Sequence, residues 1–157
     1  MKLFVLNLIV AFFWPVLVGS LTADNLIIGF ILGYLILYSI RPMLGSTEYF
    51  RKLPLTLRFI GYFMVEMIKA NVRIAWDVVT PQKYRQPGIV GVPLDVKTDI
   101  EITLLSNLIT LTPGSMAIDI SPDRKTIYIH SMFVEDADSF RKEIKEGFER
   151  RVLELLR

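Results

Sequence analysis

The stretch TDIEITLLSNLITLTPGSMAIDIS, residues 98–121, decides the fold of this chain because it holds the signals of a helix, both of its ends and the strand that follows. Thr98 and Glu101 have the spacing of a capping box, in which the hydroxyl and the carboxylate each accept a backbone amide. Thr112-Pro113-Gly114 ends the helix, since proline cannot donate to the helical ladder. Apolar and smaller or polar residues alternate over residues 116–120, which predicts a strand.

An uncharged polar stripe follows the helical period within this stretch. It consists of Thr103, Ser106, Asn107 and Thr110. Spacings of three to four residues place these side chains on one helical face. A helix of about a dozen residues is too short to cross a bilayer, which requires roughly 20. We therefore expect the stripe to be a contact surface, facing either the sheet or a neighbouring subunit, and not a pore lining.

The surrounding sequence predicts a small α/β domain over residues 88–157. Residues 88–96 are rich in β-branched side chains, and Pro93 restricts this strand to a sheet edge or a bulge. A turn over residues 121–124 leads into a second strand over 125–130, which completes a hairpin. The last helix, 136–157, carries a stripe of apolar residues: Phe140, Ile144, Phe148, Val152 and Leu155 or Leu156. The order β-α-β-β-α predicts a three-stranded sheet with both helices on one face.

The N-terminal region, residues 1–40, has the composition of a membrane anchor. Residues 3–21 and 26–40 contain no charged side chain, and a polar turn over 22–25 separates them. Two such runs predict a transmembrane helical hairpin, although the second run is short for a bilayer. Gly29 and Gly33 have the small-xxx-small spacing that allows two helices to pack closely.

A basic loop and a long amphipathic helix are predicted over residues 41–79. Lys and Arg outnumber acids between residues 41 and 58, whereas the 22–25 turn has neither Lys nor Arg. By the positive-inside rule, residues 41–58 are predicted to be cytoplasmic and the 22–25 turn external. The helix, 53–79, opens at Pro54. Its polar stripe is formed by Tyr62, Glu66, Lys69, Arg73 and Asp77.

The helix either lies at the membrane surface or forms a third membrane span, and both interpretations remain open from the sequence. Its stripe is either a solvated or subunit-facing surface with paired charges, or an ion or proton path through Glu66 and Lys69. Residues 80–87, with two prolines and no periodicity, form the linker to the soluble domain.

The composition excludes several classes of function. A net charge of +2 and the absence of interleaved exposed aromatics disfavour a nucleic-acid partner. With no cysteine and one histidine, His130, the chain has neither a thiolate nucleophile nor an evident metal site. No phosphate-binding glycine loop or serine nucleophile motif is present. We expect no enzymatic activity, no cofactor and no metal.

The chain resembles the E subunits of the Mrp-type (also Mnh or Pha) multisubunit monovalent cation/proton antiporters of bacteria and archaea. The resemblance covers nearly the whole chain and is carried by the hydrophobic N-terminal region and three motifs: Pro87-Gly88-Ile89-Val90, the run from Thr98-Asp99 to Leu108-Ile109-Thr110-Leu111-Thr112-Pro113-Gly114-Ser115, and Ile127-Tyr128-Ile129-His130. It implies an accessory membrane subunit of a complex that exchanges Na+, or in some members K+, for protons in pH homeostasis.

The resemblance also implies that larger subunits carry Na+ (or K+) and H+, and that this chain supports assembly and activity. Its partners would be the other antiporter subunits and membrane lipid. The family motif, a predicted subunit contact, supplies the candidate residues Thr98, Asp99, Asn107, Thr110, Thr112, Pro113 and Gly114. The expected protein is thus an α+β, multi-pass cell-membrane protein with a cytoplasmic C-terminal domain. The alternative is a self-standing, membrane-tethered binding module that recruits a cytoplasmic partner.

Overall fold

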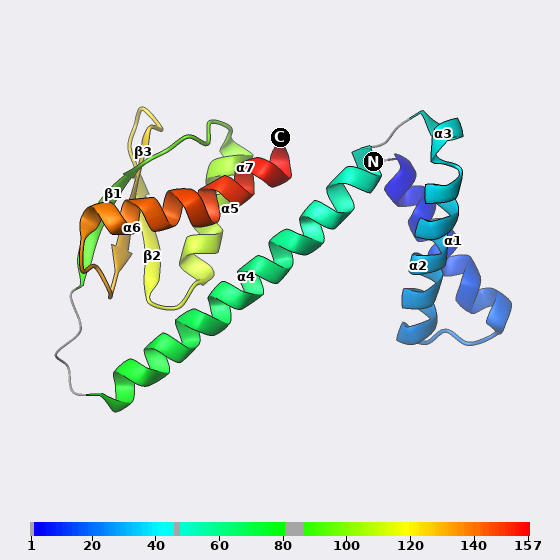
Figure 1. Cartoon of the computed structure of the whole chain (residues 1–157), viewed down its shortest axis with the longest axis horizontal. Helices are drawn as coiled ribbons and strands as arrows, with labels where there is room; N and C mark the ends of the chain where they lie inside the picture. Colours follow the sequence, from blue (N-terminus) through cyan, green and yellow to red (C-terminus); the bar gives the residue numbers. More distant parts are fainter. Residues whose placement is uncertain (1, 46–47, 81–86) are drawn as a thin grey trace. The chain divides into compact units, whose positions relative to one another are not determined.

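The computed structural model describes residues 2–45, 48–80 and 87–157 and divides into two compact units, residues 1–54 and 55–157 (Figure 1). Most of the predicted 80–87 linker lies outside the described residues. The elements of the first unit are α1 (Lys2–Val18), α2 (Ala23–Ser39), α3 (Arg41–Leu44) and the start of α4 (Glu48–Val79). Those that follow in the second unit are β1 (Gly88–Pro93), α5 (Asp99–Leu111), β2 (Ser115–Ile120), β3 (Thr126–Ser131), α6 (Ala137–Ile144), a π-helical turn η1 (Lys145–Glu149) and α7 (Arg150–Leu156).

The first unit is built on a helical hairpin in which α1 and α2 have 17 residues each. The prediction of a turn over residues 22–25 was wrong: Thr22 is the N-cap of α2, and its hydroxyl oxygen accepts the amide of Asn25 at 3.4 Å. An N-cap oxygen satisfies an amide that the helix cannot, which lets α2 begin early. Within residues 2–45, 48–80 and 87–157, no helix has the combination of length and hydropathy needed to span a membrane.

Glycines bring the two hairpin helices together, as their spacing predicted. Gly29 and Gly33 are buried in α2. A Cβ atom on Gly29 would overlap the carbonyl oxygen of Ala11 and lie 2.9 Å from the Cβ of Trp14, and one on Gly33 would overlap the side chain of Asn7. Only a residue without a side chain permits this approach.

Helix α4 begins five residues before the predicted start, and Pro54 lies inside it rather than in its first turn. Aromatic packing explains the extension. The ring of Phe50 lies 5.5 Å from that of Tyr34, and the ring of Tyr49 lies 5.9 Å from it, both edge to face. Such contacts stabilise the turn before the proline, at whose position one helical hydrogen bond is lost.

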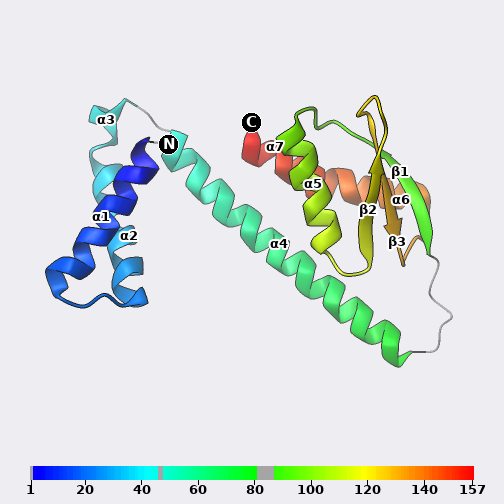
Figure 2. The same cartoon turned by 180° about the vertical axis from the view of Figure 1, so that it is seen from behind.

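The second unit contains the predicted three-stranded sheet, in the order β1-β3-β2 with both pairs antiparallel (Figures 1 and 2). β1 is at an edge, as Pro93 required. One face of the sheet is buried against α5 and the α6–α7 segment, so the predicted α+β arrangement is present. The core is formed by Val90, Val92, Ile127 and Ile129 of the sheet, Ile102, Leu105, Leu108 and Ile109 of α5, and Phe140, Ile144, Phe148 and Val152 of the last helical segment.

The predicted continuous helix over 136–157 is instead interrupted by the π-helical turn η1. Apolar residues spaced four apart drift by about 40° per step around an ideal α-helix, because each residue turns by about 100°. The wider π turn reverses part of this drift. Phe140, Ile144, Phe148 and Val152 therefore all remain in the core.

Candidate functional site

The polar stripe of α4 contains a well-formed ion pair between Glu66 and Lys69. Lys69 Nζ lies 2.7 Å from Glu66 Oε1, and the hydrogen bond from Lys69 to Glu66 raises the pKa of Lys69 above its usual value. A lysine whose pKa is raised keeps its proton at neutral pH, whereas a proton carrier has to release it. The geometry thus favours a fixed charge pair over a proton path.

Arg73 and Asp77 of the stripe line a cavity of about 660 Å³ beside α6. Arg73, Trp76 and Asp77 come from α4, and Asp77 is buried there. The guanidinium of Arg73 lies 5.8 Å from the ring centre of Phe133, within the range of a cation–π contact. These side chains form a mixed aromatic and charged wall inside the second unit.

The two sets of predicted site residues meet in a narrow groove. Glu66, Lys69 and Arg73 of α4 line it together with the Thr112-Pro113-Gly114 turn. Gly114 has φ +90°, and a Cβ atom there would lie 3.2 Å from Ile74 Cδ1. The backbone carbonyl of Gly114 also accepts the amide of Met132 at 2.9 Å. Gly114 is therefore needed both for the left-handed turn and for the close approach of α4.

Several residues of the family motif hold the local fold. Thr98 and Glu101 form the predicted capping box. The hydroxyl of Thr112 donates to the carbonyl of Leu108 at 2.8 Å, at the C-terminal end of α5. The hydroxyl of Thr110 accepts the amide of Ala117 at 3.3 Å, which couples α5 to β2. These contacts account for threonine at three motif positions.

The neutral stripe of α5 is turned away from the sheet. Thr103, Asn107 and Thr110 are exposed, and Ser106 is half-buried with its hydroxyl donating to the carbonyl of Ile102. The exposed side chains of Ile100 and Leu111 extend the same face. The stripe therefore faces away from the sheet except at Thr110, whose hydroxyl accepts the amide of Ala117 at the sheet edge.

Asp99 also reaches the surface of the domain, where its carboxylate accepts a hydrogen bond from Arg124 in the β2–β3 turn. Both side chains are well exposed, so the pair is expected to add little stability. Asp99 is thus available at the same end of the domain as the start of the α5 stripe.

Two buried carboxylates, those of Glu101 and Glu149, fix the loop between β1 and α5. Of this arrangement, the sequence predicted only the capping box of Thr98 and Glu101. Glu149 Oε1 accepts the amides of Asp95 and Val96 at 2.6 and 3.1 Å. Glu101 Oε2 accepts the next two amides, those of Lys97 and Thr98, at 2.8 and 3.1 Å. Four successive backbone donors, of which that of Val96 is buried, are thereby satisfied.

Each of these carboxylates also has a basic partner. Arg157 Nε lies 3.1 Å from Glu101 Oε1, and Lys145 Nζ lies 3.2 Å from Glu149 Oε2, as an ion pair without hydrogen-bond geometry. Hydrogen bonds from Arg157 and from the two loop amides lower the pKa of Glu101 to about 2. Nothing in the sequence marks Glu149, because an acid on a charged helix is normally solvated.

The two buried carboxylates satisfy backbone amides and pair with basic side chains. In the described part of the chain, no group of three or more His, Asp or Glu side chains is placed to hold a metal ion. His130 lies half-buried in β3, opposite Ile89 and Met116 of the flanking strands. The candidate site is therefore a pair of surfaces, the exposed stripe of α5 and the groove beneath α4.

The comparisons with known proteins agree on one family. A family model described as Na+/H+ ion antiporter subunit matches residues 7–155. The E subunit of the Na(+)/H(+) antiporter of Bacillus subtilis is 40% identical, with 97% of this chain and 96% of the relative covered. The corresponding protein of Alkalihalophilus pseudofirmus is 39% identical (96% and 95% covered), and the E1 subunit of Staphylococcus haemolyticus is 42% identical (96% and 95%).

Two solved structures share the fold. A chain of the Mrp complex from Dietzia sp. DQ12-45-1b matches with a TM-score of 0.52 at 25% identity, covering 65% of this chain and 96% of that one. A chain of the membrane-bound sulfane sulfur reductase, an archaeal respiratory membrane complex, matches with a TM-score of 0.57 at 24% identity over 96% of both chains, and this likeness shows the fold alone. On the family match and the full-length relatives, the chain belongs to the family of Na+/H+ antiporter E subunits.

Proposed function

We propose that this protein is an accessory subunit of a multisubunit Na+/H+ antiporter complex in the cell membrane, and that it supports assembly and activity in cation efflux and pH homeostasis. The family match over residues 7–155 carries this proposal. Its partners are the other subunits of the complex and membrane lipid. The exchanged cation, Na+ or K+, and the proton pass through other subunits, and the chain has no enzymatic activity of its own.

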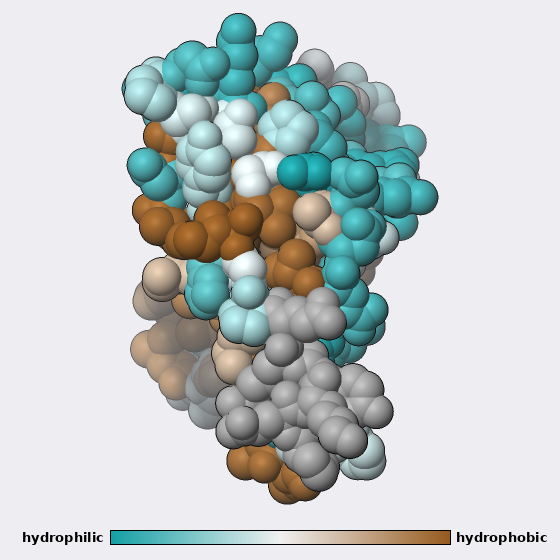
Figure 3. All heavy atoms as spheres, turned by 90° about the vertical axis from the view of Figure 1, so that its left-hand side faces the viewer, coloured by the Kyte–Doolittle hydropathy of each residue, from teal (hydrophilic) through white to brown (hydrophobic). Residues whose placement is uncertain are grey.

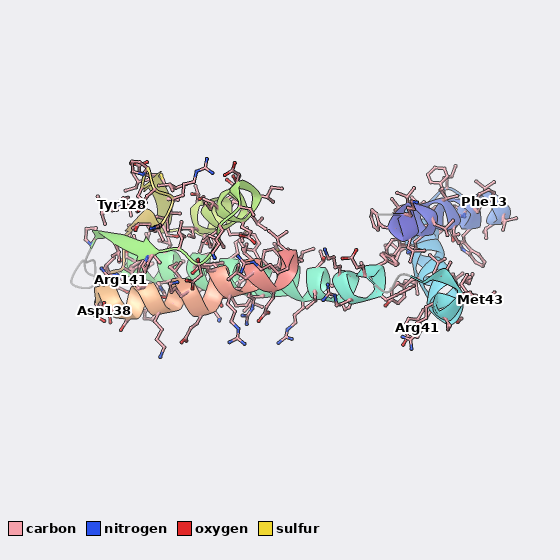
Figure 4. The ribbon with its side chains drawn as sticks, turned by 90° about the horizontal axis from the view of Figure 1, so that it is seen from above. Phe13, Arg41, Met43, Tyr128, Asp138 and Arg141 are labelled. Carbon is pink, nitrogen blue, oxygen red and sulfur yellow. The ribbon has the colours of Figure 1, made fainter. Side chains whose placement is uncertain are left out.

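The hairpin of α1 and α2 is the proposed membrane anchor. Its outward side chains are apolar and well exposed, among them Phe13 and Leu17, and Figure 4 shows Phe13 projecting from α1. The polar Asn7 is buried instead, where its amide donates to the hydroxyl of Tyr49 at 2.6 Å. Seventeen residues extend about 26 Å, so the surrounding bilayer has to thin by a few ångströms.

Basic residues after the hairpin support a cytoplasmic location for the C-terminal domain. Arg41 lies in α3, with its guanidinium 4.5 Å from the ring centre of Tyr38, and Arg51 and Lys52 follow in α4. Figure 4 labels Arg41 and the exposed Met43 at this end of the hairpin. An excess of Lys and Arg close to a span marks its cytoplasmic side.

A role in assembly fits the chemistry of the described residues better than a role in ion transfer. The Glu66–Lys69 pair is closed and charged, and the motif residues of α5 close backbone hydrogen bonds. The domain has two exposed surfaces that a partner subunit could contact. The exposed face of α5, with Asn107 at its middle, and the uncovered face of the sheet, with Ile89 and Tyr128, are the proposed subunit contacts.

Figure 3 shows hydrophobic side chains between hydrophilic ones on the side that faces the viewer. Strand addition at the sheet edges is disfavoured. Arg141 Nε donates to the carbonyl of Gly91 at the β1 edge, next to Asp138 in Figure 4, and Thr110 occupies the amide of Ala117 at the β2 edge. A partner is therefore expected to contact faces and not edges.

Deletion of the gene in its host, followed by measurement of Na+-dependent proton exchange in membrane vesicles, tests the proposal. Exchange and the amount of intact complex should both fall, and expression of the protein from a plasmid should restore them. A matched strain with Asn107→Arg should show the same loss if the α5 face is a subunit contact. Unchanged exchange with an intact complex would refute the proposal.

Native gel electrophoresis after mild detergent extraction distinguishes the accessory subunit from the alternative, a self-standing module tethered to the membrane. A subunit migrates with the complex, whereas a module migrates as a single chain of 18.0 kDa.

A further inference from the structure

Helix α4 has two opposed faces in the second unit. Phe59, Tyr62 and Phe63 pack against the domain core, and the Glu66–Lys69 pair and Arg73 lie beside the Thr112-Pro113-Gly114 turn. Its other face is apolar and exposed: Leu57, Ile60, Met64, Ile68, Val72 and Trp76. Because each residue turns by about 100°, these six side chains form one stripe on the side of the helix opposite Phe59 and Phe63.

The stripe is long and one of its borders is basic. It extends over about 30 Å of helix, since each residue adds about 1.5 Å. Arg58 and Lys69 fall at one border of the stripe by helical position, together with Trp76, a residue that is 71% exposed although it also lines the cavity beside α6. Apolar residues flanked by Lys, Arg and Trp are the composition of a helix that lies in the headgroup region of a bilayer.

From this placement we infer that α4 lies in the plane of the membrane, with its apolar stripe in the surface of a phospholipid bilayer and its opposite face holding the soluble domain. The inference rests on the proposed function, which puts the preceding hairpin in the same membrane. A span is disfavoured because Glu66, Lys69 and Arg73 would then lie at membrane depth, while in the structure they contact the domain.

The charge at the border of the stripe favours lipid over an apolar partner helix as the surface that the stripe contacts. Arg58 at the border of the stripe complements anionic headgroups, and Lys69 lies beside it with its ammonium group paired to Glu66. No acidic residue falls within the arc of the helix that the six apolar side chains cover. Asn71 is the polar residue nearest the centre of the stripe, and its amide donates to the carbonyl of Met67 at 2.7 Å, which reduces its need for water.

Fluorescence quenching by lipids tests this arrangement in the full chain. The protein has no cysteine, so single cysteines can be introduced for labelling at Ile68 and Val72, with Leu17→Cys in the hairpin and Asp138→Cys in the domain as controls. The labelled proteins are reconstituted in vesicles of phosphatidylethanolamine and phosphatidylglycerol that contain a lipid with a doxyl quencher at carbon 5 or at carbon 12.

The inference predicts that the shallow quencher lowers the fluorescence of labels at 68 and 72 about twofold, more than the deep quencher, and that the label at 138 is unaffected. Stronger quenching by the deep lipid would mean that α4 spans the bilayer, which overturns the inference. No quenching at 68 and 72 while the label at 17 is quenched overturns it without touching the proposed anchor.

The same measurement in the assembled complex separates lipid from a partner subunit. If quenching at 68 and 72 disappears on assembly, another subunit covers the stripe and the inference is wrong. If the label at 17 is also not quenched in the isolated protein, both the anchor and the inference fail.

Discussion

Replacing Glu101 by glutamine should destabilise the C-terminal domain in a pH-dependent manner. The side chain is 5% exposed, accepts the amides of Lys97 and Thr98 and pairs with Arg157. Its pKa is lowered from 4.5 to about 2. A shift of this size corresponds to roughly 3 kcal/mol, at about 1.36 kcal/mol per pH unit. Since Arg157 is half-exposed and screened by water, we expect about 2 kcal/mol.

The sign follows from the direction of the shift. A carboxylate whose pKa is lower in the folded state stabilises the fold above the pKa of the unfolded state and loses that contribution as the pH falls toward about 2. Thermal unfolding of the full chain in detergent, followed by circular dichroism, should show Tm lower by about 10 °C for Glu101→Gln at pH 7. The difference should narrow steadily toward pH 3.

A matched control is available on the same domain. Glu154 pairs with Arg150 at 3.0 Å on an exposed helix surface, and Glu154→Gln should change Tm by no more than about 2 °C. The reasoning about Glu101 is refuted if its substitution leaves Tm unchanged at pH 7, or if the two curves stay parallel between pH 7 and pH 3.

Three further experiments test the hairpin, the motif turn and the polar stripe. Gly33→Ala should lower the unfolding midpoint in detergent by several degrees because its Cβ overlaps Asn7, whereas Gly61→Ala, which meets open space, should not. Gly114→Ala should cost about 1–3 kcal/mol of unfolding free energy, since φ is +90° and Ile74 is close; a neutral effect in denaturant titration would contradict this. The double variant Glu66→Gln, Lys69→Met should retain Na+-dependent proton exchange in vesicles, and abolished exchange in an intact complex would restore the proton-path interpretation.

Most residues of the motif that carries the family resemblance stabilise the ends of α5 and its contacts with β2 and α4. Thr98 and Thr112 close the two ends of α5, Thr110 holds β2, and Gly114 lets the turn approach α4. Asn107 differs, because its side chain is exposed at the middle of the α5 face. Of the motif residues, Asn107 and Asp99 are therefore the ones best placed to contact another subunit.

The local elements of this protein could be predicted from the sequence because short-range chemistry fixes them. The capping box at Thr98, the Pro-Gly end of α5 and the edge position imposed by Pro93 each depend on a few neighbouring residues. The apolar stripe of the last helix likewise identified its core residues. The membership in the antiporter family also rested on contiguous motifs, and the family match confirmed it.

The errors arose where long-range contacts override local signals. α4 continues through Pro54 because the rings of Tyr49 and Phe50 pack against Tyr34, and the final helix acquires a π turn because four apolar residues must face one core. The sequence also left the orientation of the α5 stripe open. A residue's helical face is encoded locally, but what that face meets depends on the whole fold.

The sequence by itself thus determined most of the elements, their order along the chain and the family. Only the tertiary structure decided that Glu149 holds the amides of Asp95 and Val96, and that the polar stripe of α4 meets the Thr112-Pro113-Gly114 turn. These contacts join residues far apart in the chain. Their geometry depends on how apolar surfaces pack, which no local spacing of residues records.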